Sequence, residues 1–170
     1  MREDGRMSVE QFQGLVAEVS ARTGVADLAA DADGYLALSF DDHVLHLQYE
    51  PDDDVVALFT RLPEVEEVRA EQIYLMLLSA NLFWQGTGGG TFAVEPATGA
   101  VFLMDRRALA GLRADGAVAW LERFRAMVGH WVERLETANR GGPIDVLDPD
   151  APQDRAPEPE AGLPESFIRV

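Results

Sequence analysis

The sequence predicts an α+β fold in which helices flank an antiparallel sheet. Three observations support this prediction: alternating apolar residues over 35–61, an uncharged helical segment over 71–84, and an amphipathic helical pattern over 115–135. The links between consecutive strands are too short for crossover helices, so neighbouring strands must pair antiparallel. The expected order is one helix, three strands, a second helix, two strands, a third helix and a tail.

The first helix is predicted over Val9–Arg22. Ser8 and Gln11 have the spacing of a capping box, with Ser8 as the N-cap and Gln11 at the third helical position. The Thr23-Gly24 pair is a typical helix end. The apolar side of this helix carries Phe12, Leu15, Val16 and Val19.

Three strands are predicted next, over Tyr35–Phe40, His43–Tyr49 and Val55–Arg61. In the second of these strands apolar and polar residues alternate, which is typical of a strand with one buried face. The two-residue link Asp41-Asp42 favours a tight hairpin between the first two strands.

The central helix is predicted over Glu71–Trp84. It carries no charged residue after Glu71, and its apolar residues fall on two sides, with Leu75, Leu78 and Leu82 on one side and Ile73, Leu77 and Trp84 on the other. A surface helix normally keeps one charged face, so this helix must be covered on most sides. A chain of 170 residues has few other elements to cover it. We therefore predict a homodimer whose interface contains Leu75, Leu78, Leu82, Phe83 and Trp84.

The glycine-rich run Gly86–Gly90 stops the central helix. A second hairpin is expected from Thr91–Glu95 and Ala100–Asp105, around a Pro-Ala-Thr-Gly turn. The last helix is predicted to begin at its N-cap, Asp115, and to run to Leu135 or slightly beyond. Its apolar stripe consists of Trp120, Leu121, Phe124, Val128, Trp131 and Leu135.

The composition changes after Arg140. Six of the nine prolines and seven acidic residues follow that position. Such a segment buries too little apolar surface to offset the entropy of ordering it. The sequence therefore predicts an α+β domain over residues 1–140 and a disordered or loosely attached tail over residues 141–170. The end of the tail, Glu165–Val170, is apolar again and is able to dock on another surface.

The charge balance excludes several partners. The formal net charge is −16, and the 14 basic residues include no lysine. Nucleic acids and anionic membranes need a basic face, so neither is an expected partner. The absence of cysteine excludes disulfides and thiolate chemistry. No apolar run follows the charged N-terminus, so we expect no secretory signal and a cytoplasmic location.

No catalytic residue, cofactor site or metal site is expected. The Gly86–Gly90 run follows a helix and precedes a strand, which reverses the order needed for a phosphate-binding loop. His43 and His46 lie three residues apart on a strand and so point to opposite faces. The Asp31–Gly34 segment begins like a calcium loop, but Asp42 stands where that loop needs its final Glu.

The order of the motifs resembles a known family. The leucine-rich segment Leu75–Asn81 ends in Asn, a glycine-containing link and strand follow over Gly88–Val94, and a turn and strand follow over Thr98–Leu103. An aromatic-bearing helix, Trp120–Leu135, comes last. Over about Ser8–Asn139 this arrangement is similar to the class I type III secretion chaperones, the CesT-like (Tir chaperone) group. The resemblance implies an α-β-β-β-α-β-β-α homodimer.

The resemblance also implies a function. It predicts a cytoplasmic chaperone that binds the N-terminal region of a type III secreted effector and keeps it extended without ATP. An exposed strand edge and apolar patches can accept such a segment as an added strand. Because these apolar residues cannot all lie under one helix, we expect an effector surface formed by Phe12, Leu15, Val16, Val19, Leu36, Leu38, Leu45, Leu47 and Leu58.

Two other interpretations remain open. A dimeric α+β adaptor that regulates a secretion or signalling complex would bind a folded partner rather than an extended one. A small enzyme or nucleotide binder that uses the Gly86–Gly90 loop would be stabilised by phosphate compounds.

Overall fold

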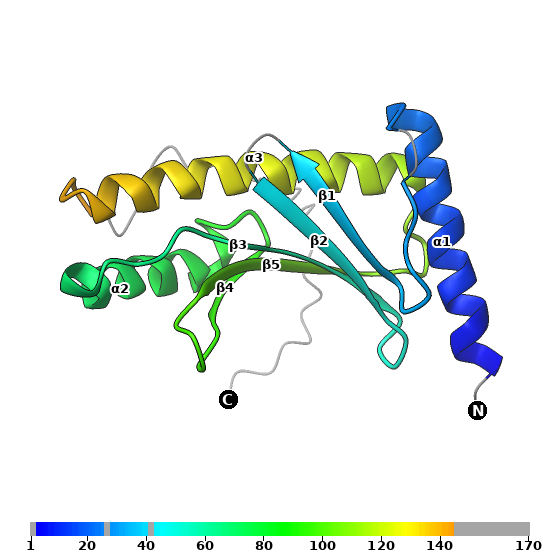
Figure 1. Cartoon of the computed structure of the whole chain (residues 1–170), viewed down its shortest axis with the longest axis horizontal. Coiled ribbons are helices and arrows are strands. Elements are labelled where there is room, and N and C mark those ends of the chain that lie inside the picture. The colour runs from blue at the N-terminus through cyan, green and yellow to red at the C-terminus, as the bar shows by residue number, and fades with distance from the viewer. Residues whose placement is uncertain (1–2, 26–27, 41–42, 145–170) are drawn as a thin grey trace, which may run out of the picture.

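A computed structural model describes residues 3–25, 28–40 and 43–144 of the chain. The element order is the predicted one, and it confirms the α+β fold class (Figure 1). In chain order the elements are α1 (Glu3–Thr23), β1 (Tyr35–Phe40), β2 (His43–Glu50), β3 (Val55–Arg61), the 3₁₀ turn η1 (Glu67–Arg69), α2 (Ala70–Asn81), the 3₁₀ turn η2 (Leu82–Trp84), β4 (Thr91–Val94), β5 (Val101–Ala108) and α3 (Ala114–Asn139).

The five strands form one antiparallel sheet in the order β1-β2-β3-β5-β4. The first three strands are a meander, and Phe40 pairs with His43 across the first hairpin. The chain then leaves the sheet to form α2 and returns as the β4–β5 hairpin, whose second strand pairs with β3. The two edges of the sheet are therefore β1 and β4.

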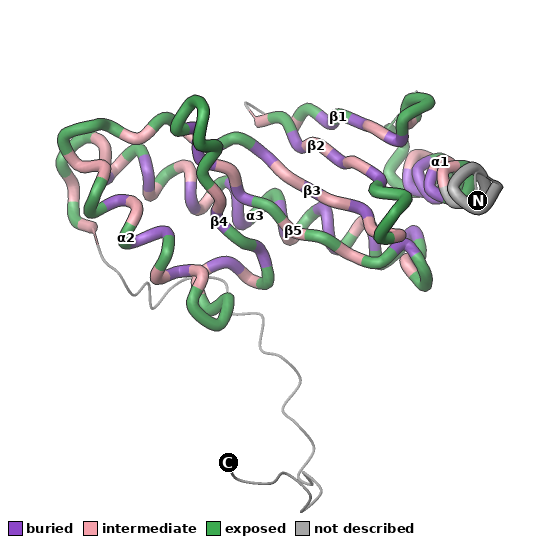
Figure 2. Tube along the Cα trace, turned by 90° about the horizontal axis from the view of Figure 1, so that it is seen from below, coloured by how far each residue is buried: buried purple, intermediate pink, exposed green. Residues whose placement is uncertain are grey.

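One long helix organises the rest of the molecule. Helix α3 runs along one face of the sheet with its N-terminal half and lies over α2 with its C-terminal half (Figure 1). Helix α1 crosses the far end of the sheet and packs against α3. Seen from the opposite face, buried positions alternate with more exposed ones along the strands (Figure 2). This alternation follows the two-residue period of a strand with one face on the core.

Three predicted boundaries are wrong. Helix α1 begins at Glu3, so Ser8 lies inside the helix and is not its N-cap; the preceding residues contain no proline, and the helical bonds continue through them. Helix α3 begins at Ala114, and Asp115 lies in its first turn, where it pairs with Arg22 of α1. Strand β5 extends to Ala108, because its residues from Phe102 to Ala108 stay paired with β3.

The end of the central helix also differs from the prediction. Helix α2 stops at Asn81, and the chain turns through η2 with left-handed backbone at Phe83 (φ 53°) and Trp84 (φ 55°). Trp84 therefore does not lie on the side of α2 that carries Ile73 and Leu77. The predicted Asp41-Asp42 link and most of the predicted tail, from residue 145 onward, lie outside the described residues.

Candidate interaction surfaces

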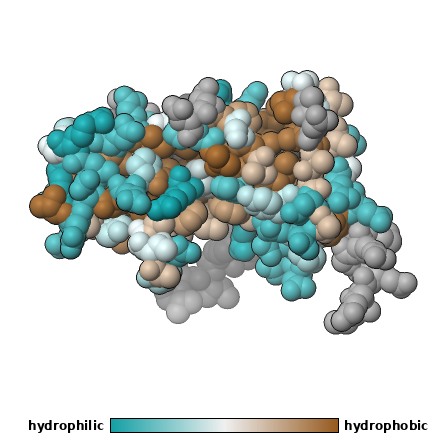
Figure 3. Space-filling model, viewed as in Figure 1, coloured by the Kyte–Doolittle hydropathy of each residue, from teal (hydrophilic) through white to brown (hydrophobic). Residues whose placement is uncertain are grey.

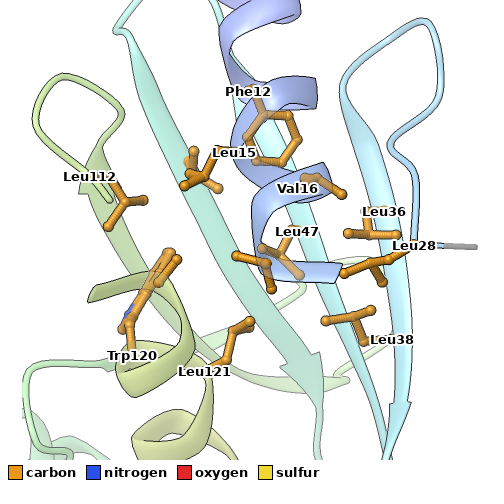
Figure 4. Close-up of a pocket in the computed structure, with 13 residues that line it drawn as sticks. Phe12, Leu15, Val16, Leu28, Leu36, Leu38, Leu47, Leu112, Trp120 and Leu121 are labelled. Atoms are coloured by element: carbon orange, nitrogen blue, oxygen red, sulfur yellow. The ribbon is translucent and has the colours of Figure 1, made fainter. Parts of the chain in front are cut away.

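The nine residues predicted to bind an effector lie in the core of the domain. All nine are buried in the single chain, so an effector reaches them only where a groove opens onto them, and their contact with an effector stays a prediction. The physical reason for their burial is that two helices cover this face of the sheet: α1 over one end and α3 along its length. Phe12 of α1 stacks on Tyr49 of β2, with ring centroids 5.8 Å apart. The side chains around Leu47 and Trp120 converge between the two helices and leave an apolar cavity of only about 20 Å³ (Figure 4).

An open groove lies beside this core, along the free edge of β1. It has a volume of about 560 Å³ and runs between β1, the C-terminal end of α1 and the N-terminal half of α3. Three of the predicted effector residues, Val19, Leu36 and Leu38, line it. Hydrophobic residues gather between β1 and α3 on this side of the molecule (Figure 3). The other lining residues are Thr23, Val25, Leu28, Ala37, Ser39, Phe40, Val118, Leu121, Glu122 and Arg125.

The backbone along the outer edge of β1 is available for pairing. The N–H of Tyr35 donates to Asp31 Oδ1, and the Tyr35 carbonyl accepts from the Asp31 N–H, both at 2.8 Å. Both groups of Tyr35 therefore point away from β2, and the two-residue alternation places those of Ala37 and Ser39 on the same side. Within the described ranges no hydrogen bond reaches these outward groups of Ala37 and Ser39. The edge is thus open over a short stretch beside the groove.

The other edge of the sheet is closed at its centre. The side chain of Asn81 bonds both the N–H and the carbonyl of Phe92, at 2.8 and 3.2 Å. These are the outward backbone groups at the centre of β4, which is only four residues long. Of the two edges, β1 therefore offers the better place for an additional strand.

A second apolar surface lies on α2 and η2. The helix has two opposite apolar sides, as predicted: Ile73, Met76, Leu77 and Ala80 are buried, while Leu75 and Leu78 are exposed. All five residues predicted for a dimer interface are exposed in the single chain, from 57% for Leu75 to 75% for Phe83. We call Leu75, Leu78, Leu82, Phe83 and Trp84 the α2 patch. An exposed apolar cluster of this kind is typical of a protein–protein contact.

The backbone below the α2 patch holds two aromatic residues in a strained conformation. Left-handed φ angles at Phe83 and Trp84 are unusual for bulky residues and cost free energy. The next turn is tightly packed: the Gly86 N–H donates to the Ala80 carbonyl, and Trp131 Nε1 donates to the Gly86 carbonyl. A Cβ on Gly86 would lie 2.7 Å from Ala80 Cβ, so only glycine fits there. The fold thus fixes the backbone that carries the two exposed rings.

The sequence reasoning missed most of the groove. Phe40 and Leu121 are predicted only as members of a strand and of an apolar stripe, and Val25, Leu28 and Val118 have no predicted role. The signal that would have identified them is the position of β1 at the sheet edge, which the order of strands in the chain does not reveal.

The glycine-rich run has a structural role in the described fold. The hydroxyl of the buried Thr87 donates to the Gly90 carbonyl at 2.6 Å, and a Cβ on Gly90 would come within 3.0 Å of the Met104 carbonyl.

In the part of the chain that the structure describes, no three metal-binding side chains cluster together. None of the helices in the described ranges has both the length and the apolar character to span a membrane.

Comparison with known proteins assigns the fold to a family. The model of the Tir chaperone protein (CesT) family matches residues 14–132. No curated protein sequence matches this chain significantly.

Solved structures share the architecture at low sequence identity. The ExsC–ExsE complex contains a chain 23% identical to this one, with a TM-score of 0.65; the match covers 75% of this chain and 95% of that chain. The HopA1–SchA chaperone–effector complex gives 16% identity, a TM-score of 0.60 and coverages of 76% and 95%. The ExoT–SpcS complex from Pseudomonas aeruginosa contains a chain 24% identical to this one, with a TM-score of 0.53; the match covers 74% of this chain and 97% of that chain.

Proposed function

Because the chain belongs to the Tir chaperone protein (CesT) family, we propose that it is a chaperone for a type III secreted effector. It acts in the cytoplasm as a homodimer, binds the N-terminal region of the effector, and keeps that region extended without ATP. The similar solved structures include a chaperone–effector complex, HopA1–SchA, which supports an effector as the partner.

The observation that carries this proposal is the open edge of β1 beside an apolar groove. An extended segment placed there gains main-chain hydrogen bonds from Ala37 and Ser39 and buries alternate side chains against Leu36 and Leu121. Each net hydrogen bond contributes only about 0.5–1.5 kcal/mol, so apolar burial must supply much of the affinity. An extended segment has all of its main-chain groups free to pair with this edge, which favours an extended effector segment over the folded partner of an adaptor.

The α2 patch supports the homodimer. Five large apolar side chains on one short segment are more than a monomer usually leaves exposed. The patch lies on the far side of the molecule from the α1 end of the sheet, so a second copy there leaves the groove open (Figure 1). We expect an interface of about 1,000 Å² or more in total, the usual minimum for a specific dimer.

A single substitution tests the effector site. The N–H of Ala37 points away from β2, so Ala37→Pro removes an outward donor without breaking the β1–β2 pairing. The probe is the N-terminal region of a secreted protein encoded beside this chain, titrated by calorimetry against the full-length protein. We expect Ala37→Pro to weaken binding about tenfold or more, whereas Ala37→Ser, the matched control, keeps affinity within about twofold.

Three results would contradict the proposal. Equal affinity of wild type and Ala37→Pro would move the partner away from the β1 edge. Binding only to a probe that is already folded would favour the adaptor. Binding without a large negative heat-capacity change would exclude coupled ordering of the probe.

A further inference from the structure

We propose that the C-terminal segment Ser166–Val170 of this same chain occupies the β1-edge groove as a short added strand. The inference about its role rests on the proposed function: a segment in the groove competes with the effector and keeps the apolar edge covered until cargo arrives. The docking itself does not depend on an effector.

The segment has the chemistry of a strand. After Pro143, the longest stretch without proline is Glu165–Val170, and proline is the residue that cannot donate to a strand ladder. Its residues alternate, so Ile168 and Val170 share one face and Phe167 and Arg169 share the other. The β-branched pair suits a groove lined by leucine and valine, while Arg169 stays toward solvent.

The size of the open edge matches a segment of this length. Asp31 already closes the edge at Tyr35, and the strand ends at Phe40, which leaves Ala37 and Ser39 as the open positions. A partner strand of about five residues spans this stretch, since strand residues advance about 3.3 Å each. A longer segment is not needed to fill it.

The chain is long enough to reach the groove. Arg69 binds the Gly142 carbonyl and so holds the chain at the C-terminal end of α3. The groove lies beside Leu121, 18 residues back along that helix, which is about 27 Å at 1.5 Å per residue. A proline-rich linker the length of residues 145–164 reaches about 60 Å when it is extended, which exceeds this distance. The tether therefore raises the local concentration of the segment at the groove.

Charge favours the end of the tail over its middle. The described domain is acidic, and residues 145–164 carry six further carboxylates against one arginine. That part of the tail is repelled by the domain. The side chains of residues 165–170 include one glutamate and one arginine, so this segment is repelled less than residues 145–164. The sequence thus places an apolar segment of low side-chain charge after an acidic tether.

The absence of cysteine gives a direct test. The variant Arg169→Cys places a single spin label on the face predicted to point to solvent. In the full-length ¹⁵N-labelled protein we expect the label to broaden the amide signals of β1, residues 35–40, to less than half their reduced-label intensity. Unchanged β1 signals, or broadening centred on the α2 patch instead, would overturn the proposal.

A matched pair of variants controls the test. In the labelled background, Ile168→Asp puts a charge into the groove and should abolish the broadening of β1. Leu163→Asp makes the same change in the tether and should leave the broadening in place. If both variants restored the β1 signals, or if neither did, the label would approach β1 without Ile168 binding in the groove, and the proposal would be wrong.

The effect on cargo is measured separately. Apparent affinity falls with the fraction of grooves that are free, so Ile168→Asp should bind the effector probe about three- to tenfold more tightly than wild type. If Ile168→Asp binds the effector probe no more tightly than wild type, while the label in the Arg169→Cys protein still broadens the β1 signals, the segment docks in the groove but does not compete with the effector. Loss of the proposed effector function leaves the spin-label result unaffected, because that experiment contains no effector.

Discussion

The carboxamide of Asn81 bonds both main-chain polar groups of Phe92, which joins the end of α2 to the outer edge of β4. Its Oδ1 accepts from the Phe92 N–H at 2.8 Å, and its Nδ2 donates to the Phe92 carbonyl at 3.2 Å. The side chain of a second asparagine, Asn139, also makes two hydrogen bonds to the main chain. Its Oδ1 accepts from the Glu66 N–H at 3.0 Å, and its Nδ2 donates to the Glu64 carbonyl at 2.7 Å. These two residues fix both ends of the α2 region on the domain, so the α2 patch is presented at a defined angle.

Replacing Asn81 should destabilise the domain. In Asn81→Ala the backbone groups of the buried Phe92 lose their partner, and leaving such groups unpaired costs about 1–3 kcal/mol. Urea unfolding at fixed protein concentration measures the loss. Gln72→Ala, on the exposed side of the same helix, is the control and should change stability by less than about 0.5 kcal/mol. A similar small effect for Asn81→Ala would contradict the assigned role.

Leu78→Asp should dissociate the dimer without unfolding the protomer. Leu78 is exposed in the single chain, so the charge costs little there, but it becomes an unpaired charge in an apolar interface. Light scattering at micromolar concentration should change from twice the chain mass to the chain mass, while circular dichroism stays native. Val44→Asp, an exposed aliphatic residue on the sheet, should remain dimeric. A wild-type protein that is already monomeric would refute the interface.

The two-sided character of α2 was readable from the sequence because helical spacing assigns residues to sides. Ile73 and Leu77 fall about 160–200° from Leu75 at 100° per residue, and the structure buries the first two and exposes the third. The uncharged run therefore predicted both the buried contact and the exposed patch. The end of the helix was not readable, since Phe83 and Trp84 adopt a backbone that their residue types disfavour.

The groove could not be predicted because it depends on which strand lies at the edge. Leu36 and Leu45 have the same alternating pattern in the sequence, yet only Leu36 borders the groove. That difference arises when β5 returns beside β3 and leaves β1 unpaired on one side. The buried positions of the nine predicted effector residues have a similar origin, because the path of α3 over the sheet is set by tertiary packing.

Two glycine substitutions should act in opposite directions. Gly129 lies on the exposed side of α3 with open space around it, so Gly129→Ala should stabilise the protein by about 0.5–1 kcal/mol by restricting the unfolded chain. Gly86→Ala forces a Cβ into Ala80 and should destabilise by about 1–3 kcal/mol. Thermal unfolding of the two variants beside wild type is the measurement. Stabilisation by Gly86→Ala would show that the turn after η2 is looser than described.

The strained backbone of η2 should make Phe83 a residue that weakens the protomer and strengthens the dimer. Glycine adopts a left-handed φ freely, whereas alanine keeps the strain, so Phe83→Gly and Phe83→Ala differ in backbone conformation but both lose the ring. In the monomeric Leu78→Asp background we expect the glycine variant to be more stable than the alanine variant by about 1 kcal/mol. Urea unfolding measures this difference.

In the wild-type background both Phe83 variants should weaken dimerisation, and to a similar extent, because the proposed interface places this ring, 75% exposed in the single chain, against the second copy. Sedimentation equilibrium over a range of concentrations gives the dissociation constants. If alanine is as stable as glycine, the left-handed backbone at Phe83 is not strained; if the dimer is unaffected by either variant, the ring lies outside the interface. The two measurements together test whether the strained backbone of Phe83 in η2 lowers protomer stability while its ring stabilises a dimer, because strained residues are found mostly at functional sites.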